Sequence, residues 1–192
     1  MLLLGEHRYE KGQIDKGYND RTLHIDIATR TLTEKPVDDQ MKQLFIGGKG
    51  FDLWLLWNAI EPQTRWDDPA NEIVISSGPM GGTPVYPGSG KSIVCSISPV
   101  TGSVIDSNVG GYFGPYLKFA GFDALELQGK RDVPVVVVID GDNEVIRFYD
   151  GSELPDEAYD MCNAISDIFG DDKPIKVATV CAGPGAKHSW WG

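Results

Sequence analysis

The chain has 192 residues, of which 41% are hydrophobic and 23% charged, and its formal net charge is −11. This length and composition suit a globular protein that buries a core of its own. The acidic excess repels a phosphate backbone and argues against a nucleic-acid partner. No apolar run is long enough to span a membrane, and the first residues lack the features of a signal peptide. We therefore expect a cytoplasmic protein without a membrane partner.

The three cysteines, Cys95, Cys162 and Cys181, are widely spaced and show no C-x-x-C pattern. The sequence therefore predicts neither a disulfide framework nor a zinc or iron–sulfur site within this chain. The simplest interpretation is that all three are small hydrophobic residues buried in a protein of a reducing cytosol.

The chain begins with a polar segment that is followed by a hairpin. Residues 1–21 are rich in glycine and charge, and we expect an N-terminal arm without its own core. Residues 22–28 alternate between apolar and polar, which predicts a half-buried strand with His24 facing solvent. Residues 31–33 can pair back with this strand.

Two helices are expected next. Residues 38–45 indicate a short helix with an aspartate near its start. Residues 51–60 are apolar on nearly all sides, which indicates a buried helix. We therefore expect its two tryptophans, Trp54 and Trp57, to lie in the core.

Short strands dominate from residue 72 onwards. They are expected over residues 72–77, 91–97, 103–106, 124–128, 135–140, 144–149 and 176–182, with helices over 114–120 and 155–169. Strands and helices do not alternate strictly, so the sequence predicts an α+β fold with mixed or antiparallel β-sheets and a few helices. No linker divides the sequence, and residues 22–192 are expected to form one domain.

Glycines gather between Gly78 and Gly129, near strand ends and helix starts. Glycine permits positive φ and lets a ligand approach the backbone. Loops that turn successive N–H groups inward bind phosphate and similar anions. The alternative is that these glycines only form turns, and composition alone does not favour either interpretation.

The sequence PGSGKS at 87–92 resembles the end of a Walker A loop but departs from that motif twice. The motif requires glycine where Val85 stands, and a helix after the lysine, whereas the residues after Lys91 predict a strand. Lys91 remains well placed to meet a phosphate as a point charge. The histidines lie in unrelated contexts and no serine has a G-x-S-x-G environment, so we assign no catalytic residue. The pattern indicates a binding platform.

Several motifs resemble the N-terminal domain of the aldehyde ferredoxin oxidoreductase family. They are GGKG at 47–50, SGP at 77–79, SPVTG at 98–102, NVGGYFG at 108–114, LKFAGFD at 117–123 and AGPG at 182–185. The likeness covers about residues 22–185 and is most specific between 98 and 129.

The resemblance implies a β-sheet base under a tungsten (or molybdenum) cofactor with two pyranopterin dithiolenes. Lys91 stands where the family has an arginine that contacts pterin phosphate, and it keeps the charge but loses the bidentate fork. Asn108 matches an asparagine whose backbone carbonyl helps to hold the magnesium ion that bridges the pterin phosphates. Gly110 and Gly111 match glycines that lie against the pterin, and Val109 replaces a relative's serine.

The resemblance also implies an enzyme that oxidises aldehydes to carboxylic acids. Its electrons would pass through a four-iron–four-sulfur cluster to ferredoxin or another electron-transfer protein. The second pterin segment and the iron–sulfur domains are expected beyond residue 192, so the 192-residue chain alone is expected to be inactive. Two alternatives are the same domain in a benzoyl-CoA-reductase-type subunit and a non-catalytic cofactor-binding module. A homo-oligomer is compatible with each of these functions.

Overall fold

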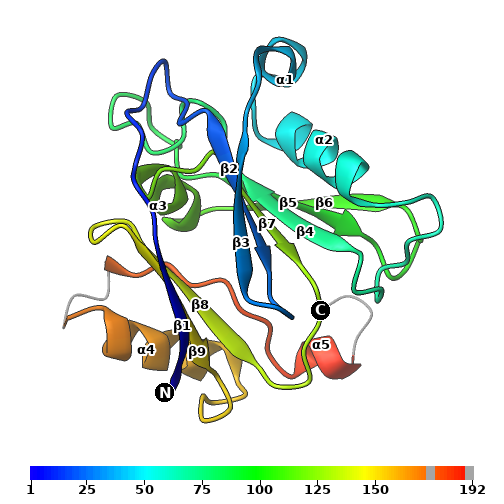
Figure 1. Cartoon of the computed structure of the whole chain (residues 1–192), viewed down its shortest axis with the longest axis vertical. Coiled ribbons are helices and arrows are strands. Elements are labelled where there is room, and N and C mark those ends of the chain that lie inside the picture. Colours follow the sequence, from blue (N-terminus) through cyan, green and yellow to red (C-terminus); the bar gives the residue numbers. More distant parts are fainter. Residues whose placement is uncertain (172–175, 189–192) are drawn as a thin grey trace.

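The computed structural model describes residues 1–171 and 176–188, and two β-sheets form its centre (Figure 1). The strands are β1 (Leu3–Arg8), β2 (Arg21–Asp26), β3 (Thr31–Pro36), β4 (Glu72–Ser76), β5 (Ser92–Ile97), β6 (Val104–Val109), β7 (Ala124–Gln128), β8 (Val135–Asp140) and β9 (Val145–Asp150). The helices are α1 (Asp39–Phe45), α2 (Lys49–Ala59), α3 (Phe113–Phe119), α4 (Ala158–Phe169) and α5 (Gly185–His188). Among these helices, none is long and apolar enough to cross a membrane.

The larger sheet has the strand order β3-β2-β7-β4-β5-β6, and the smaller sheet has the order β1-β9-β8. Strands β2 and β7 are parallel, and every other pairing of named strands is antiparallel. The expected α+β fold with mixed and antiparallel sheets is therefore confirmed. Part of the polar N-terminal segment is also ordered into a strand, because β1 adds to the edge of the β8–β9 hairpin.

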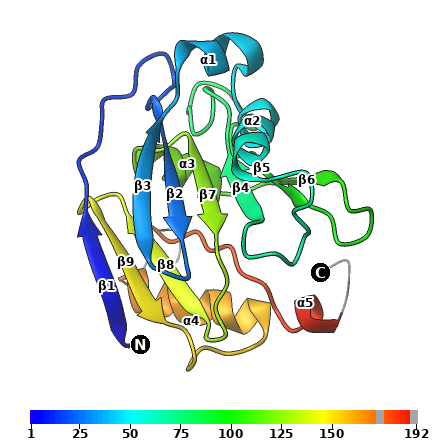
Figure 2. The ribbon, with the colours of Figure 1, turned by 45° about the vertical axis from the view of Figure 1, so that its right-hand side comes forward.

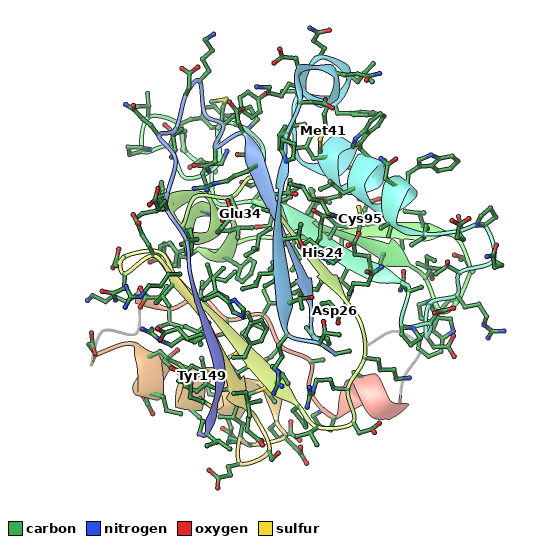
Figure 3. All side chains as sticks on the ribbon, viewed as in Figure 1. His24, Asp26, Glu34, Met41, Cys95 and Tyr149 are labelled. Carbon is green, nitrogen blue, oxygen red and sulfur yellow. The ribbon has the colours of Figure 1, made fainter. Side chains whose placement is uncertain are left out.

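Alternation along the larger sheet separates two cores, one on each face. One face packs towards the smaller sheet and α3, and the other packs under α1 and α2, as the arrangement in Figure 2 shows. The buried residues of the first core are Leu23, Ile25, Ile75, Leu117, Ala120, Phe122, Leu125, Ile146 and Phe148. Those of the second are Val37, Met41, Phe51, Leu55, Leu56, Val74, Cys95 and Ala124. Met41 and Cys95 mark this second core in Figure 3.

Helix α2 buries only one of its faces, which corrects the expectation of an all-round buried helix. Phe51, Leu55 and Leu56 face the sheet, and Trp54 packs beside them. Trp57, in contrast, is 80% exposed. A helix that lies on the outside of a sheet has one apolar contact face, so the tryptophan on its other side stays in solvent.

Two further expectations are wrong. His24 does not face open solvent: its Nε2 atom lies 3.3 Å from Gln128 Oε1 and 3.4 Å from Glu72 Oε1, because these residues share one face of the sheet. Residues 176–182 form no strand, although they include the β-branched Val177, Thr179 and Val180. The segment pairs with neither sheet and leads to Gly183, which packs against Ala158 at the start of α4.

Two carboxyl groups are buried without hydrogen bonds to the rest of the described structure. Asp52 on α2 and Glu72 on β4 are both 0% exposed. Their oxygens make no hydrogen bond of good geometry within the described residues, although Ser76 and Cys95 lie beside Asp52 and His24 lies beside Glu72. Burial raises the pKa of Asp52 to about 8. Burial, followed by repulsion from Glu126, raises the pKa of Glu72 to about 8. Both groups are therefore expected to be mostly protonated at neutral pH.

These carboxyl groups predict that the folded protein loses stability as the pH rises. The unfolded chain releases the Asp52 proton near its ordinary pKa of 3.8, whereas the folded protein keeps it up to about pH 8. The contribution of Asp52 to the free energy of unfolding is therefore fully present below the unfolded-state pKa of 3.8 and is lost by about pH 8. When the pH rises from about 6 to about 7.5, the free energy of unfolding of the native chain should fall by about 2 kcal/mol more than that of Asp52→Asn, because the amide has no proton to release. Urea denaturation at both pH values measures this, and equal losses in the two proteins would contradict it.

Candidate ligand-binding platform

The pairing of β5 with β6 brings together the five residues that the sequence singled out for cofactor binding. Ser92 pairs with Val109 and Ile93 pairs with Asn108. Lys91 directly precedes Ser92, and Gly110 directly follows Val109, so both lie at the same end of the hairpin. Residues 91 and 108–111 are all exposed. We call this surface, Lys91 with residues 108–111, the platform.

The platform glycines differ in what surrounds them. A Cβ atom on Gly110 or Gly111 would meet no heavy atom within 4 Å, so their outer side is open. Gly111 has a φ of 123°, a conformation that favours glycine. Gly90 lies so close to the neighbouring loop that its Cβ would stand 2.7 Å from the Gly111 carbonyl oxygen. Glycine at these positions therefore brings two backbone segments together and leaves their outer side free.

Lys91 supplies a positive charge at the edge of this open surface. Its side chain makes no ion pair or hydrogen bond with the residues that the structure describes. Lys49, nearby on α2, is by contrast engaged by Asp106 of β6, with Nζ and Oδ1 2.6 Å apart. A strand follows Lys91, as expected, so the helix that a Walker A loop requires is missing.

Apolar side chains are exposed on and around the platform. Val109 is 39% exposed and Tyr112 is 55% exposed. Met80, Val85 and Tyr86, in the loop that leads to Lys91, are more than half exposed. Exposed apolar groups that gather in one region commonly mark a surface that a ligand or another part of a protein covers.

The loop over residues 78–90 is folded on itself and onto α3. The Gly82 amide donates to the Ser89 carbonyl over 2.9 Å, and the Ser89 hydroxyl donates to the Thr83 carbonyl over 2.8 Å. A Cβ on Gly82 would stand 2.9 Å from the ring of Phe119. These contacts hold the two ends of the loop together and place Lys91 at the start of β5.

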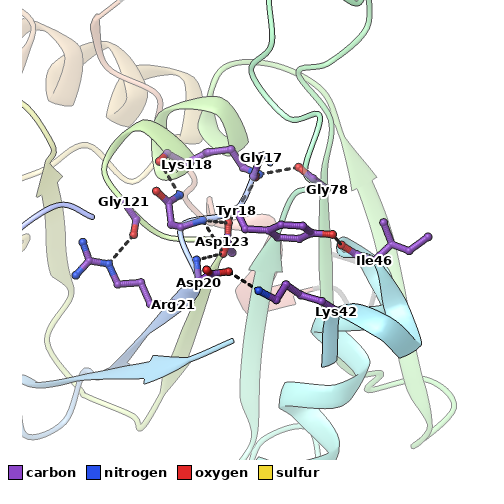
Figure 4. Close-up of polar contacts among 11 residues, drawn as sticks. Gly17, Tyr18, Asp20, Arg21, Lys42, Ile46, Gly78, Lys118, Gly121 and Asp123 are labelled. Atoms are coloured by element: carbon purple, nitrogen blue, oxygen red, sulfur yellow. Dashed lines mark hydrogen bonds and ion pairs between the residues drawn. The ribbon is translucent and has the colours of Figure 1, made fainter. Parts of the chain in front are cut away.

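A buried ion pair fixes the beginning of this loop (Figure 4). Lys118 on α3 is 3% exposed, and its ammonium donates to the carbonyls of Gly17 over 2.6 Å and Gly78 over 2.8 Å. Asp123 lies 3.8 Å from the same ammonium and accepts from the Asn19 amide over 3.0 Å. Burial lowers the pKa of Lys118 and raises that of Asp123, and each partner opposes the effect on the other.

The same cluster joins the N-terminal segment to the loop. The Tyr18 hydroxyl donates to the Ile46 carbonyl over 2.6 Å. Gly17, with a φ of 87°, packs against the Pro79 backbone so closely that a side chain there would overlap it. We call Lys118, Asp123 and the backbone of Gly17 and Gly78 the clamp. The clamp was not predicted from the sequence, although both side chains stand in the LKFAGFD motif.

This geometry is suited to binding. The platform combines a cation that has no partner among the described residues with an open backbone surface. Such a surface can take an anionic group at Lys91 and a planar group beside the glycines. Within the residues that the structure describes, no three His, Cys, Asp or Glu side chains are grouped to hold a metal ion.

The family model of the N-terminal domain of aldehyde ferredoxin oxidoreductase matches residues 22–190. This chain belongs to the aldehyde ferredoxin oxidoreductase family. The matched region includes the whole platform, and it includes the side chains of the clamp but not Gly17. The family assignment that the sequence motifs suggested is thus confirmed.

The members of the family that resemble this chain are named as oxidoreductases. A tungsten-containing aldehyde ferredoxin oxidoreductase of Pyrococcus horikoshii is 30% identical over 90% of this chain and 28% of its own length. The WOR-like subunit of an aliphatic sulfonate oxidoreductase of Pyrococcus furiosus is 32% identical over 68% of this chain and 21% of its own length. The chain thus spans little more than a quarter of the tungsten-containing relative.

A solved structure has the same fold. The active-site complex BamBC of benzoyl coenzyme A reductase, solved with 1,5-dienoyl-CoA, aligns with a TM-score of 0.76 and 26% sequence identity. The alignment covers 82% of this chain and 24% of that chain. The domain therefore occurs in family members named for different substrates.

Proposed function

We propose that this chain is the cofactor-binding domain of a tungsten enzyme that oxidises aldehydes to carboxylic acids. The observation that carries the proposal is the meeting of one unpaired cation, Lys91, with two open glycines, Gly110 and Gly111, at the end of the β5–β6 hairpin. The names of the tungsten-containing relatives support the choice of metal and substrate class. Molybdenum in place of tungsten is compatible with the same surface.

The residues of the platform fit a pyranopterin cofactor with phosphate groups. Lys91 would bind a pterin phosphate through its charge. The backbone carbonyl of Asn108 would be a ligand of a magnesium ion that bridges the phosphates, since magnesium prefers oxygen ligands. Gly110 and Gly111 would let the flat pterin lie against the backbone, where side chains would occupy its space. Val109 offers no hydroxyl, so its side chain would contribute apolar contact only.

When bound, the metal–dithiolene group supplies the two-electron oxidation of the aldehyde. The role of this chain is to hold and orient that group and to keep water from one side of it. The electrons would leave through an iron–sulfur cluster to ferredoxin or another electron-transfer protein. In this proposal, the cluster and the acid–base residues belong to the part of the family's length that this chain does not span.

Two measurements test the proposal. The whole protein that carries this domain should contain about one tungsten or molybdenum per chain and should reduce a viologen dye when an aldehyde is added. The 192-residue chain alone should show no aldehyde-dependent dye reduction above a heat-treated control, because it provides the platform only. A metal-free whole protein that is active, or an active 192-residue chain, would contradict the proposal.

The structural similarity to the benzoyl coenzyme A reductase complex favours one second candidate, a domain of a ring-reducing enzyme. The same whole protein can be tested with 1,5-dienoyl-CoA as the electron donor in place of aldehydes. Dye reduction with the dienoyl thioester and none with aldehydes would select the second candidate, and the opposite result would select the first.

A further inference from the structure

Two of the three cysteines lie against each other, although they are distant in sequence. Cys162 is on α4, and Cys181 is in the extended segment that follows residue 175. Their Sγ atoms are 3.5 Å apart, and both residues are partly exposed. Cys95 is 0% exposed in the core under α2. The expectation of three buried, unrelated cysteines therefore holds for Cys95 only.

Close packing fixes the segment that carries Cys181 beside the start of α4. The Cys181 thiol lies 3.7 Å from the Ala158 carbonyl oxygen. A Cβ on Gly183 would stand only 3.1 Å from the Cβ of Ala158. The small residues on both sides allow the backbone of the segment to approach the helix. The contacts with Ala158 therefore hold the Cys181 segment beside the helix that carries Cys162.

We propose that Cys162 and Cys181 are a redox modification site that forms a reversible disulfide. The sulfur atoms need to approach by about 1.5 Å to reach bonding distance, which a side-chain rotation on the extended segment can provide. The site is separate from the platform and does not depend on the proposed function. Its bond would link the segment at 176–184 covalently to α4.

The oxidant for this reaction is a low-molecular-weight disulfide. Burial, followed by the neighbouring Cys162 thiol, raises the pKa of the Cys181 thiol, which lowers its thiolate fraction. The Cys162 thiolate attacks the small disulfide, and one small thiolate leaves. The Cys181 thiolate then attacks Cys162 Sγ and releases the second small thiolate. Two protein thiols are oxidised by two electrons in total, and the small disulfide is reduced to two thiols that take up the two protons.

Oxidised glutathione, followed by denaturation and alkylation with N-ethylmaleimide, tests this site in the 192-residue chain. Two of the three cysteines should become protected, with the protein mass lowered by two hydrogen atoms, and dithiothreitol should reverse the change. Peptide mapping should place the bond between Cys162 and Cys181. The bonded form should melt about 5–10 °C higher, because the bond constrains the unfolded chain.

Matched single variants separate the pair from the third cysteine. Cys95→Ser should still form the bond, whereas Cys162→Ser and Cys181→Ser should stop at a mixed disulfide with glutathione. Three alkylated cysteines in the treated native chain, a bond that includes Cys95, or a stable double mixed disulfide would each overturn the proposal.

Discussion

Lys118→Met is expected to lower the free energy of unfolding by about 3–5 kcal/mol, because it leaves the charge of Asp123 buried without its partner. The substitution also removes the donor to two buried carbonyls, those of Gly17 and Gly78. An unpaired buried acceptor costs about 1–3 kcal/mol. Denaturation in urea at neutral pH measures the difference from the native chain.

Lys42→Met is the matched control for this experiment. Lys42 also pairs with an aspartate, Asp20, over 2.8 Å, but Asp20 is 53% exposed. A surface pair of this kind contributes about 0–1 kcal/mol, so this variant should remain close to the native stability. Equal losses in the two variants would contradict the account of the clamp. Hydrogen exchange adds a local readout, since Lys118→Met should loosen the amides of Gly81 and Gly82 more than those of the β8–β9 hairpin.

The family resemblance pointed to the platform residues, and their proximity follows from their positions along the chain. Lys91 and Asn108 flank two consecutive strands, and an antiparallel hairpin brings the start of one strand beside the end of the next. Apolar runs of strand length between turn residues also gave β7 and β8 their observed bounds. The local sequence pattern was sufficient to predict these contacts, because the paired strands are neighbours along the chain.

The clamp could not be predicted in the same way. Lys118 stands in an apolar helix, and its partners are backbone carbonyls 101 and 40 residues away. Backbone atoms leave no residue-type signal in a sequence. The same reason applies to Cys162 and Cys181, which are brought together by packing and not by a spacing motif.

The expected burial of Trp57 and the expected strand over residues 176–182 were wrong for a related reason. Apolar composition indicates that a segment is able to pack, but not how many of its faces find a partner. Trp57 is exposed on α2, and residues 176–182 pair with no strand of either sheet.

Charge at position 91 gives a graded test of the platform. In the whole protein, Lys91→Ala should weaken cofactor binding about ten- to a hundredfold, the range expected for a charge-assisted contact of about 1.5–3 kcal/mol. Lys91→Arg should retain the cofactor, since it keeps the charge and restores the arginine expected from the family resemblance. Both variants are expected to have the same free energy of unfolding as the native protein, because the Lys91 side chain is exposed.

Gly110→Val gives the sharpest change on the platform. Gly110 does not have a positive φ, and its Cβ would meet nothing within 4 Å, so valine fits the free protein without strain. A bound pterin would fill that same space. Gly5→Val in β1 is the matched control, because it also lies in a strand region with room, 3.9 Å from the Phe148 ring, and is not part of the platform.

Tungsten per chain in the purified whole protein, measured for the native form, Gly110→Val and Gly5→Val, decides the central proposal. We expect native tungsten content in Gly5→Val and loss of most of the metal in Gly110→Val, with both variants unfolding like the native protein. Full tungsten in a folded Gly110→Val protein would contradict a cofactor that lies on this surface.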